Sequence, residues 1–206
     1  DVELLDFACG TGRIASLLEQ RVHSCTGVDV SPSMLAVARE KLTKTEIVEA
    51  DITSSDVMRD RKFDLITAFR FFVNAEPALR DAAIKALAGL LSKDGCLVFN
   101  NHQNIDSPWM RLRHWRYRRK GSQGTFNIMT VKQMHDLVES VGLEIVEICP
   151  VGFFHPPRVP VSQGLCRVID GGLGAFKCLA RLSESPIAVC RWRQNAAAQD
   201  PGGQSG

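Results

Sequence analysis

The sequence lacks the features that mark several protein classes. It has no C-x-x-C pair and no histidine cluster at metal-ligand spacing. Its seven cysteines are an odd number spread along the chain, so we predict reduced thiols, a cytoplasmic protein and no metal site. No apolar stretch reaches the roughly 18 residues of a membrane span, and we find neither a signal peptide nor an internal repeat.

The chain also lacks a large excess of charge. The formal net charge is +2, so a preference for acidic partners would have to come from local clustering. With 206 residues, 45% of them hydrophobic and 23% charged, the composition is that of a globular domain with a sizeable core. We predict one domain over residues 1–193 and a disordered polar tail over 194–206.

Apolar runs alternate with helical patterns over the first hundred residues, with short connections between them. This alternation predicts an α/β fold with a doubly wound, mostly parallel sheet covered on both faces. The strands are expected at 2–7, 25–29, 46–50, 63–69 and 96–100, and the helices at 13–20, 31–42 and 77–92. The expected inward-facing side chains are Ile14, Leu17, Leu18, Met34, Leu35, Ala38, Leu42, Leu79, Ala83, Leu87, Leu90 and Leu91.

The second half of the chain is less regular. Residues 93–95 read as a turn, and Thr130 with Gln133 forms a capping box that predicts a helix ending near Gly142. A sixth strand is expected over 143–148 and a last strand over 187–192, with a loop rich in proline and glycine over 150–174 between them.

No acidic residue occurs between Ser107 and Val131, where arginines stand among aromatic residues. The stretch 109–120, inside an insert over about 105–129, has three interpretations. The first interpretation is a solvated helix face with buried tryptophans. The second is a lid that holds a phosphate or carboxylate group of an acceptor, and the third is a nucleic-acid-binding patch with stacking aromatic side chains. The modest overall charge disfavours the third.

The first turn of the chain carries the strongest functional signal. Gly10-Thr11-Gly12-Arg13-Ile14-Ala15 fits the G-x-G-x-x-A fingerprint of dinucleotide sites, and Asp29 follows about twenty residues later, where a ribose-binding acid is expected. An S-adenosylmethionine site uses the same fold and the same acid. Asp6 separates the two, because its carboxylate would repel a pyrophosphate but would stabilise an ammonium or a sulfonium.

The wider pattern is similar to a known family. Asp6–Gly12, Gly27–Leu35, Glu49–Ile52, Phe63–Ile66 and Lys93–Leu97 occur in the order found in class I S-adenosylmethionine-dependent methyltransferases, which the chain closely resembles. The resemblance implies a Rossmann-like sheet of seven strands with an antiparallel last strand. Family members also carry helices before the first strand, and we expect any such helices to lie outside this sequence.

The resemblance implies roles for particular residues. Asp29 would bind both ribose hydroxyls, Asp51 the adenine amino group beside the Ile52 amide, and Met34 would pack on the adenosine. Ala8 stands where the family usually has its first glycine, and we expect binding to survive this change. Cys9 lies beside the cofactor, although a small buried thiol is the better interpretation of it. The complete expected cofactor site is Asp6, Ala8, Cys9, Gly10, Gly12, Asp29, Val30, Met34, Asp51, Ile52 and Phe69.

The sequence indicates the acceptor less clearly than the cofactor. Methyl transfer from a sulfonium depends mainly on how the two reactants are positioned, and it needs no dedicated nucleophile on the protein. His102 and Arg70 are the candidate catalytic residues: His102 as a base, against a structural histidine, and Arg70 as a contact to an acidic acceptor, against a surface charge. The segment 69–74 has neither a Pro-Pro-Tyr nor a Pro-Cys motif. We therefore expect methylation of oxygen or nitrogen in a small molecule, with an RNA methyltransferase, a non-catalytic nucleotide-binding module or an NAD enzyme as alternatives.

Overall fold

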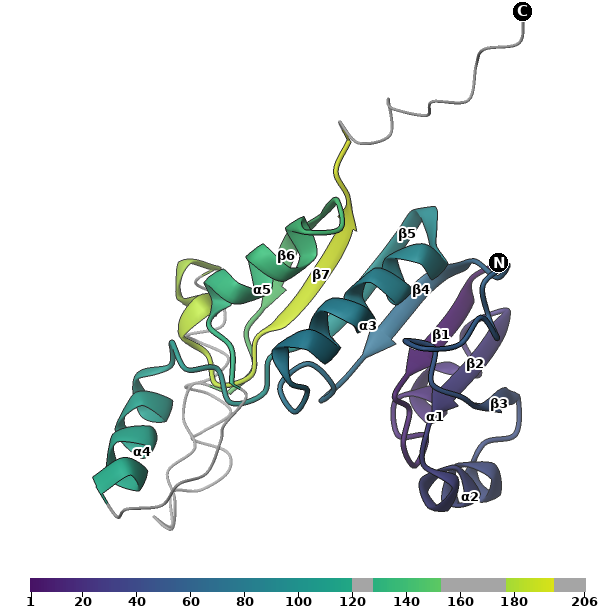
Figure 1. The fold of residues 1–206 in the computed structure, drawn as a ribbon, viewed down its shortest axis with the longest axis horizontal. Helices are drawn as coiled ribbons and strands as arrows, with labels where there is room; N and C mark the ends of the chain where they lie inside the picture. The colour runs from purple at the N-terminus through teal and green to yellow at the C-terminus, as the bar shows by residue number, and fades with distance from the viewer. Residues whose placement is uncertain (120–127, 153–176, 195–206) are drawn as a thin grey trace, which may run out of the picture.

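The computed structural model describes residues 1–119, 128–152 and 177–194. In these residues seven strands form one sheet in the order β3-β2-β1-β4-β5-β7-β6 (Figure 1). The five N-terminal strands are parallel, and β7 runs antiparallel to both β5 and β6, which confirms the expected topology. The strands are β1 (Glu3–Phe7), β2 (Ser24–Asp29), β3 (Thr45–Glu49), β4 (Phe63–Ala68), β5 (Leu91–Asn100), β6 (Leu143–Cys149) and β7 (Ile187–Trp192).

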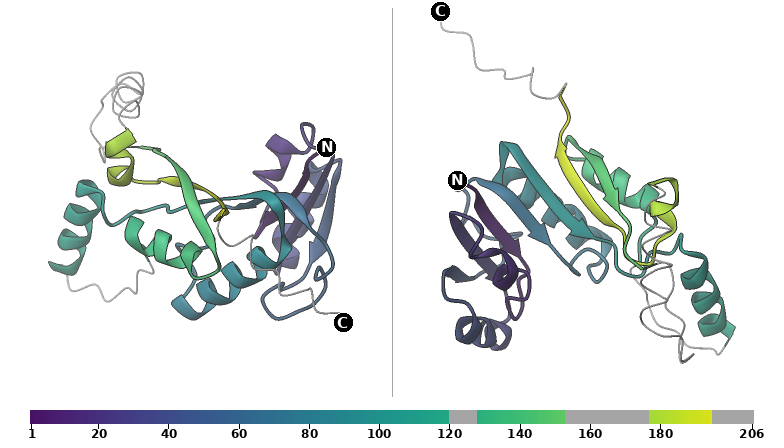
Figure 2. Two further views of the ribbon diagram at one scale, coloured as in Figure 1. Left: turned by 90° about the horizontal axis from the view of Figure 1, so that it is seen from above. Right: turned by 180° about the vertical axis from the view of Figure 1, so that it is seen from behind.

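Helices cover both faces of this sheet. α3 and α5 lie over one face, and α1 lies on the other (Figure 2, left). Neighbouring residues of β1 show the consequence, because Leu4 and Leu5 point to opposite faces and are both fully buried. The helices are α1 (Ala15–Leu18), α2 (Pro32–Lys41), α3 (Pro77–Leu90), α4 (Pro108–Arg119) and α5 (Val131–Glu139), with a 3-10 helix η1 (Lys177–Leu182).

The helix-end signals in the sequence are mostly confirmed. Thr130 accepts a hydrogen bond from the Gln133 amide, and the Gln133 side chain accepts one from the Thr130 amide, so the capping box is complete. Gly142 has a φ of 82°, in the left-handed region where glycine has no steric cost. Pro32 begins α2 as predicted, although the Ser31 side chain makes no capping hydrogen bond.

Two predicted boundaries are wrong. The helix expected over 13–20 shortens to the four residues of α1, and Leu17 is 66% exposed. Strand β5 begins at Leu91, directly after α3, although residues 93–95 were expected to form a turn before it. Leu91 pairs with Phe63 and Cys96 with Leu65, so the extra residues are accommodated as an irregularity inside the strand.

Two other side chains expected in the core are exposed. Met34 is 48% exposed on α2 and Leu79 is 41% exposed on α3. Both line the cavity described below, so their apolar side chains face a cavity and not the core. The remainder of the predicted stripe of α2, Leu35, Ala38 and Leu42, is buried.

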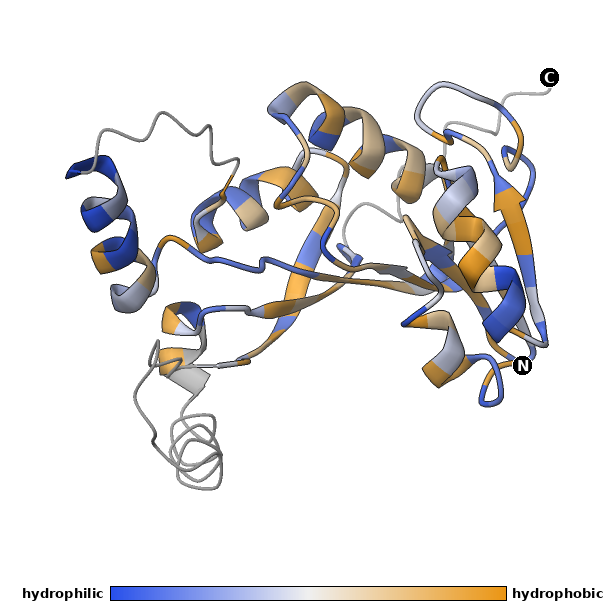
Figure 3. Cartoon of the chain, turned by 90° about the horizontal axis from the view of Figure 1, so that it is seen from below, coloured by the Kyte–Doolittle hydropathy of each residue, from blue (hydrophilic) through white to orange (hydrophobic). Residues whose placement is uncertain are grey.

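The basic stretch forms helix α4, which is largely hydrophilic (Figure 3). Met110 is its buried residue, whereas Trp115 is 49% exposed and its ring lies 4.0 Å from the Arg119 guanidinium carbon. The first of the three interpretations, a solvated helix face with buried tryptophans, is therefore wrong for Trp115. Most of the loop expected over 150–174 and all but the first residue of the expected tail lie outside the described residues.

Two glycines offer a test of how the first loop is packed. Gly12 has a φ of 69°, and a Cβ there would lie 2.6 Å from Leu42 Cδ1, whereas a Cβ on Gly89 in α3 would meet nothing within 4 Å. We predict that Gly12→Ala lowers the free energy of unfolding by about 2 kcal/mol through left-handed strain and steric overlap. Gly89→Ala, the control, leaves it unchanged or raises it by about 0.5 kcal/mol. Urea denaturation measures both, and equal effects would contradict this packing.

Candidate active site

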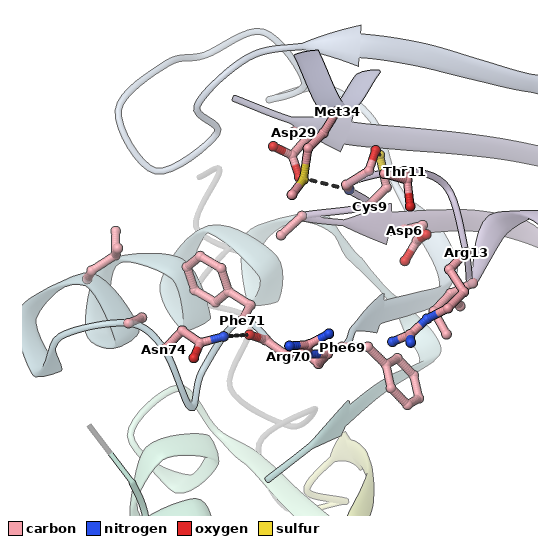
Figure 4. Close-up of a pocket in the computed structure, with 15 residues that line it drawn as sticks. Asp6, Cys9, Thr11, Arg13, Asp29, Met34, Phe69, Arg70, Phe71 and Asn74 are labelled. Atoms are coloured by element: carbon pink, nitrogen blue, oxygen red, sulfur yellow. Dashed lines mark hydrogen bonds between the residues drawn. The ribbon is translucent and has the colours of Figure 1, made fainter. Parts of the chain in front are cut away.

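A cavity of about 540 Å³ opens where β1, β2 and β4 end. The carboxyl ends of parallel strands are where open α/β sheets bind ligands. The loop after β1 forms one wall of the cavity, and the segment after β4 forms another (Figure 4). The lining residues are Asp6, Ala8, Cys9, Gly10, Thr11, Arg13, Ile14, Asp29, Met34, Phe69, Arg70, Phe71, Asn74, Ala75 and Leu79.

Asp29, at the end of β2, holds the loop after β1 in place. Its Oδ2 accepts a hydrogen bond of 2.8 Å from the Gly10 amide, and its Oδ1 accepts one of 2.9 Å from the Ser31 amide. A carboxylate has about four lone-pair sites, so acceptor capacity remains on both oxygens. The side chain can thus brace the loop and still accept hydrogen bonds from a pair of hydroxyls.

The loop takes left-handed backbone conformations to pass close to the cavity. Ala8, Gly10 and Gly12 have φ values of 53°, 55° and 69°. A Cβ on Gly10 would lie 3.3 Å from the Met34 sulfur, so the glycine leaves room between the loop and α2. Ala8 adopts a left-handed conformation that costs a residue with a Cβ roughly 1–2 kcal/mol.

Asp6 is a buried carboxylate in the wall of the cavity, with 2% of its surface exposed. The Thr67 hydroxyl donates to it at 2.7 Å and the Ala15 amide at 3.1 Å. Burial raises the pKa of Asp6 from 3.8 to about 6, against these hydrogen bonds, and the nearby charge of Asp29 adds to the rise. A cation bound next to Asp6 would oppose the same effect.

Cys9 is 8% exposed and lines the cavity together with Asp6 and Asp29. Burial, followed by the negative charges of Asp6 and Asp29, raises the pKa of its thiol to about 12. The group is therefore a neutral thiol near pH 7, as the interpretation of Cys9 as a small buried residue requires. Cys9 is a reduced thiol, as are Cys25, Cys96 and Cys190.

Aromatic rings support the wall that follows β4. The Phe7 and Phe71 rings pack edge to face with centroids 4.6 Å apart, and Phe72 continues this contact to Phe99 at 5.0 Å. Phe72 and Phe99 are fully buried, so the wall is anchored in the core. Phe69 and Phe71 remain at the cavity.

Two arginines enter the same cavity from different elements. Arg13 follows β1 and Arg70 follows β4, and both side chains project toward the end of the cavity where Phe69 lies (Figure 4). Within the described residues no carboxylate forms an ion pair with either guanidinium. Both groups are therefore available to an anionic ligand.

The structure brings together seven of the expected cofactor residues and places four elsewhere. Asp6, Ala8, Cys9, Gly10, Asp29, Met34 and Phe69 line the cavity, and Arg70 joins them. Gly12 packs against Leu42, and Val30 is 63% exposed outside the lining. Asp51 accepts hydrogen bonds from Thr53, while Ile52 lines a second cavity of about 460 Å³ beside α3.

His102, the candidate base, is exposed and is not part of the lining. Sequence reasoning also missed lining residues, above all Arg13 and Asn74. Arg13 occupies a variable position of the glycine fingerprint, so the pattern alone predicts no role for its side chain. Asn74 comes close to the cavity through a turn in which the Asn74 and Ala75 amides both donate to the Phe71 carbonyl, and this turn has no distinct sequence signal.

The comparisons with known proteins agree with this geometry. Residues 4–95 match a family model described as a methyltransferase domain. The chain is 29% identical over 205 residues to a trans-aconitate 2-methyltransferase of Escherichia coli O157:H7, covering 95% of this chain and 77% of that protein. A homologous protein of Shigella flexneri serotype 5b with the same name has the same identity and coverage.

Solved structures share the fold at lower identity. A possible histamine N-methyltransferase of Thermotoga maritima superposes with a TM-score of 0.67 at 17% identity, over 94% of this chain and 83% of that chain. A magnesium protoporphyrin IX methyltransferase of Synechocystis PCC 6803, solved with S-adenosylhomocysteine, gives 0.63 at 14% identity, over 93% and 74%. These solved structures show that the chain has the fold of S-adenosylmethionine-dependent methyltransferases, in agreement with the domain match over residues 4–95.

The methyltransferase domain match agrees with the expected cofactor, S-adenosylmethionine, and not with a dinucleotide. The residues present fit it: the Gly10 backbone leaves space beside Met34, Asp29 retains acceptor capacity, and Asp6 is a buried anion. No group of three or more histidine, cysteine, aspartate or glutamate side chains within the described residues could hold a metal ion. Among the same residues, no helix is both long enough and apolar enough to cross a bilayer.

The buried carboxylate of Asp6 predicts a pH-dependent stability. Because its pKa is higher in the folded protein, its contribution to stability is greatest below pH 4 and is lost as the pH rises toward 6. The Asp6→Asn variant lacks this loss. We therefore predict that the unfolding free energy of Asp6→Asn minus that of the wild type increases by about 2 kcal/mol from pH 4 to pH 7. Urea denaturation at both pH values measures this difference.

The matched control for this comparison is Asp136→Asn. The Asp136 side chain is 55% exposed on α5 and pairs with Lys132. Its difference from the wild type should change by no more than about 0.5 kcal/mol between the two pH values. If the difference between Asp6→Asn and the wild type changes with pH as little as it does for this control, burial does not destabilise the charged form of Asp6.

Proposed function

We propose that this methyltransferase acts on a small anionic molecule and methylates a carboxylate oxygen. The observation that carries the proposal is the composition of the cavity, whose described lining offers two guanidinium groups, Arg13 and Arg70, and no histidine. Asp6 is buried and hydrogen-bonded, and the Cys9 thiol has a pKa of about 12. An acceptor carboxylate is already an anionic nucleophile, so its reaction does not require a base.

The cofactor-binding part of the proposal assigns one group to each charge. Asp29 would accept the ribose hydroxyls, Asp6 would stabilise the cationic part of the methionine, and Arg13 would hold its carboxylate. When bound, S-adenosylmethionine would supply a methyl group on a positively charged sulfur, and this sulfur would become a neutral thioether once the methyl group is transferred. The chain itself binds and orients the two reactants and excludes water through Phe69 and Phe71.

The acceptor part rests on Arg70, which lies beside Phe69 and Phe71 at the edge of the cavity. A guanidinium binds a carboxylate through two parallel hydrogen bonds, which fixes the orientation of the acceptor. The E. coli relative takes its name from trans-aconitate, a carboxylic acid, and supports an acceptor of this class. Reduced thiols at Cys9, Cys25, Cys96 and Cys190 support the expectation of a cytoplasmic protein.

Binding of the demethylated cofactor tests the role of Asp29. We predict that Asp29→Ala weakens the affinity for S-adenosylhomocysteine by at least about tenfold, because a charged hydrogen-bond acceptor is worth roughly 1.5–3 kcal/mol. Isothermal titration calorimetry measures the affinity, and thermal melting checks that the variant is folded. Asp136→Ala, on the exposed surface of α5, serves as the control and keeps the wild-type affinity. A folded Asp29→Ala protein with unchanged affinity would refute this assignment.

Turnover tests the acceptor class. Release of S-adenosylhomocysteine is followed with a panel of mono-, di- and tricarboxylic acids, and with amines and phenols of similar size. We predict turnover of carboxylic acids, and an increase of at least about tenfold in their KM for Arg70→Gln, with S-adenosylhomocysteine affinity unchanged. Arg39→Gln, in an exposed position of α2, is the control. Turnover restricted to amines or phenols would overturn the proposal.

A further inference from the structure

Arg70 has an unusual backbone for a residue of its type. Its φ is 61°, in the left-handed region that residues with a Cβ avoid. Besides Ala8 in the cofactor loop, Gln103 is the other described non-glycine residue with a positive φ. Glycine would take this conformation at Arg70 without strain. A strained residue whose side chain enters a cavity indicates that the side chain is used.

Two asparagine side chains hold the backbone of Arg70 from both sides. Asn100 Oδ1 accepts a hydrogen bond of 2.7 Å from the Arg70 amide. Asn74 Nδ2 donates one of 2.6 Å to the Arg70 carbonyl (Figure 4). Both peptide groups that flank the Arg70 Cα are therefore fixed. The orientation of the side chain at its first bond follows from these two contacts.

Asn100 is itself held firmly. It is the last residue of β5 and is 6% exposed, and its Nδ2 donates to the Ser185 hydroxyl at 3.2 Å. Asn100 also pairs with Ile187 at the start of β7. The contact to Arg70 thus links the ends of two sheet strands to the edge of the cavity, whereas Asn74 acts from the turn that follows Arg70.

We infer that Asn100 and Asn74 are positioning residues that keep Arg70 in its left-handed conformation and so direct its guanidinium at the acceptor carboxylate. Neither asparagine needs to touch the acceptor. The inference rests on the proposed function, because it assigns a purpose to the Arg70 side chain. It adds that acceptor affinity depends on these two hydrogen bonds.

The test is a double-mutant cycle with trans-aconitate as the probe. Its affinity is measured calorimetrically in the presence of S-adenosylhomocysteine for wild type, Asn100→Ala, Arg70→Gln and the double variant. We expect Asn100→Ala to weaken binding about fivefold to tenfold in the wild-type background, and less than twofold in the Arg70→Gln background. Equal effects of Asn100→Ala in both backgrounds would overturn the inference.

Controls separate this role from a general structural one. Asn101 is the next residue and is fully buried, and its Nδ2 donates to the Met129 carbonyl. Asn101→Ala should lower the melting temperature, but it should not weaken probe binding as Asn100→Ala does. Asn74 is exposed, so Asn74→Ala should remain folded and weaken binding about twofold to fivefold. A loss of probe affinity in Asn101→Ala as large as in Asn100→Ala would contradict positioning.

Arg70→Gly provides a second, independent readout. Relief of the left-handed strain should raise the melting temperature by roughly 2–4 °C, while probe binding is lost. A lower melting temperature in this variant would contradict the strain argument. If Arg70→Gln leaves trans-aconitate affinity unchanged, the proposed acceptor site fails; if it weakens affinity but Asn100→Ala and Asn74→Ala do not, only the positioning inference fails.

Discussion

The hydrogen bonds of the Asp29 carboxylate are the constraint on which the cofactor half of the cavity depends. One oxygen holds the Gly10 amide and the other the Ser31 amide, so a single side chain at the end of β2 sets the loop after β1 against the start of α2. The Asp29 carbonyl also accepts from the Ala50 amide, which ties the same residue to the end of β3. Binding a nucleoside at Asp29 would therefore engage three strand ends together.

The site stores several unfavourable features that the rest of the fold supports. Asp6 is a buried carboxylate, and burial disfavours its charged form and raises its pKa to about 6. Ala8 and Arg70 have backbone conformations in the left-handed region. Each has local support: Thr67 and Ala15 donate to Asp6, Val28 accepts from the Cys9 amide next to Ala8, and two asparagines hold Arg70. These features cost stability, and their concentration around one cavity is the physical signature of a functional site.

Sequence patterns predicted the sheet better than they predicted the cavity. The parallel strands were readable because each is a short apolar run bounded by a turn, and the capping box at Thr130 gave the start of α5. Local pattern could not show that Met34 and Leu79 face a cavity, because an apolar residue at helical spacing fits either environment. The contact of Asn100 with Arg70 spans thirty residues, so it depends on how β4 and β5 align and leaves no local signal.

A crystal structure of the chain with S-adenosylhomocysteine tests the central claim most directly. We predict the ribose hydroxyls within hydrogen-bond distance of the Asp29 carboxylate, the methionine part next to Asp6 and Arg13, and the sulfur facing Phe69 and Arg70. A nucleoside bound instead in the second cavity, between Ile52 and α3, or a ribose that makes no contact with Asp29, would contradict it.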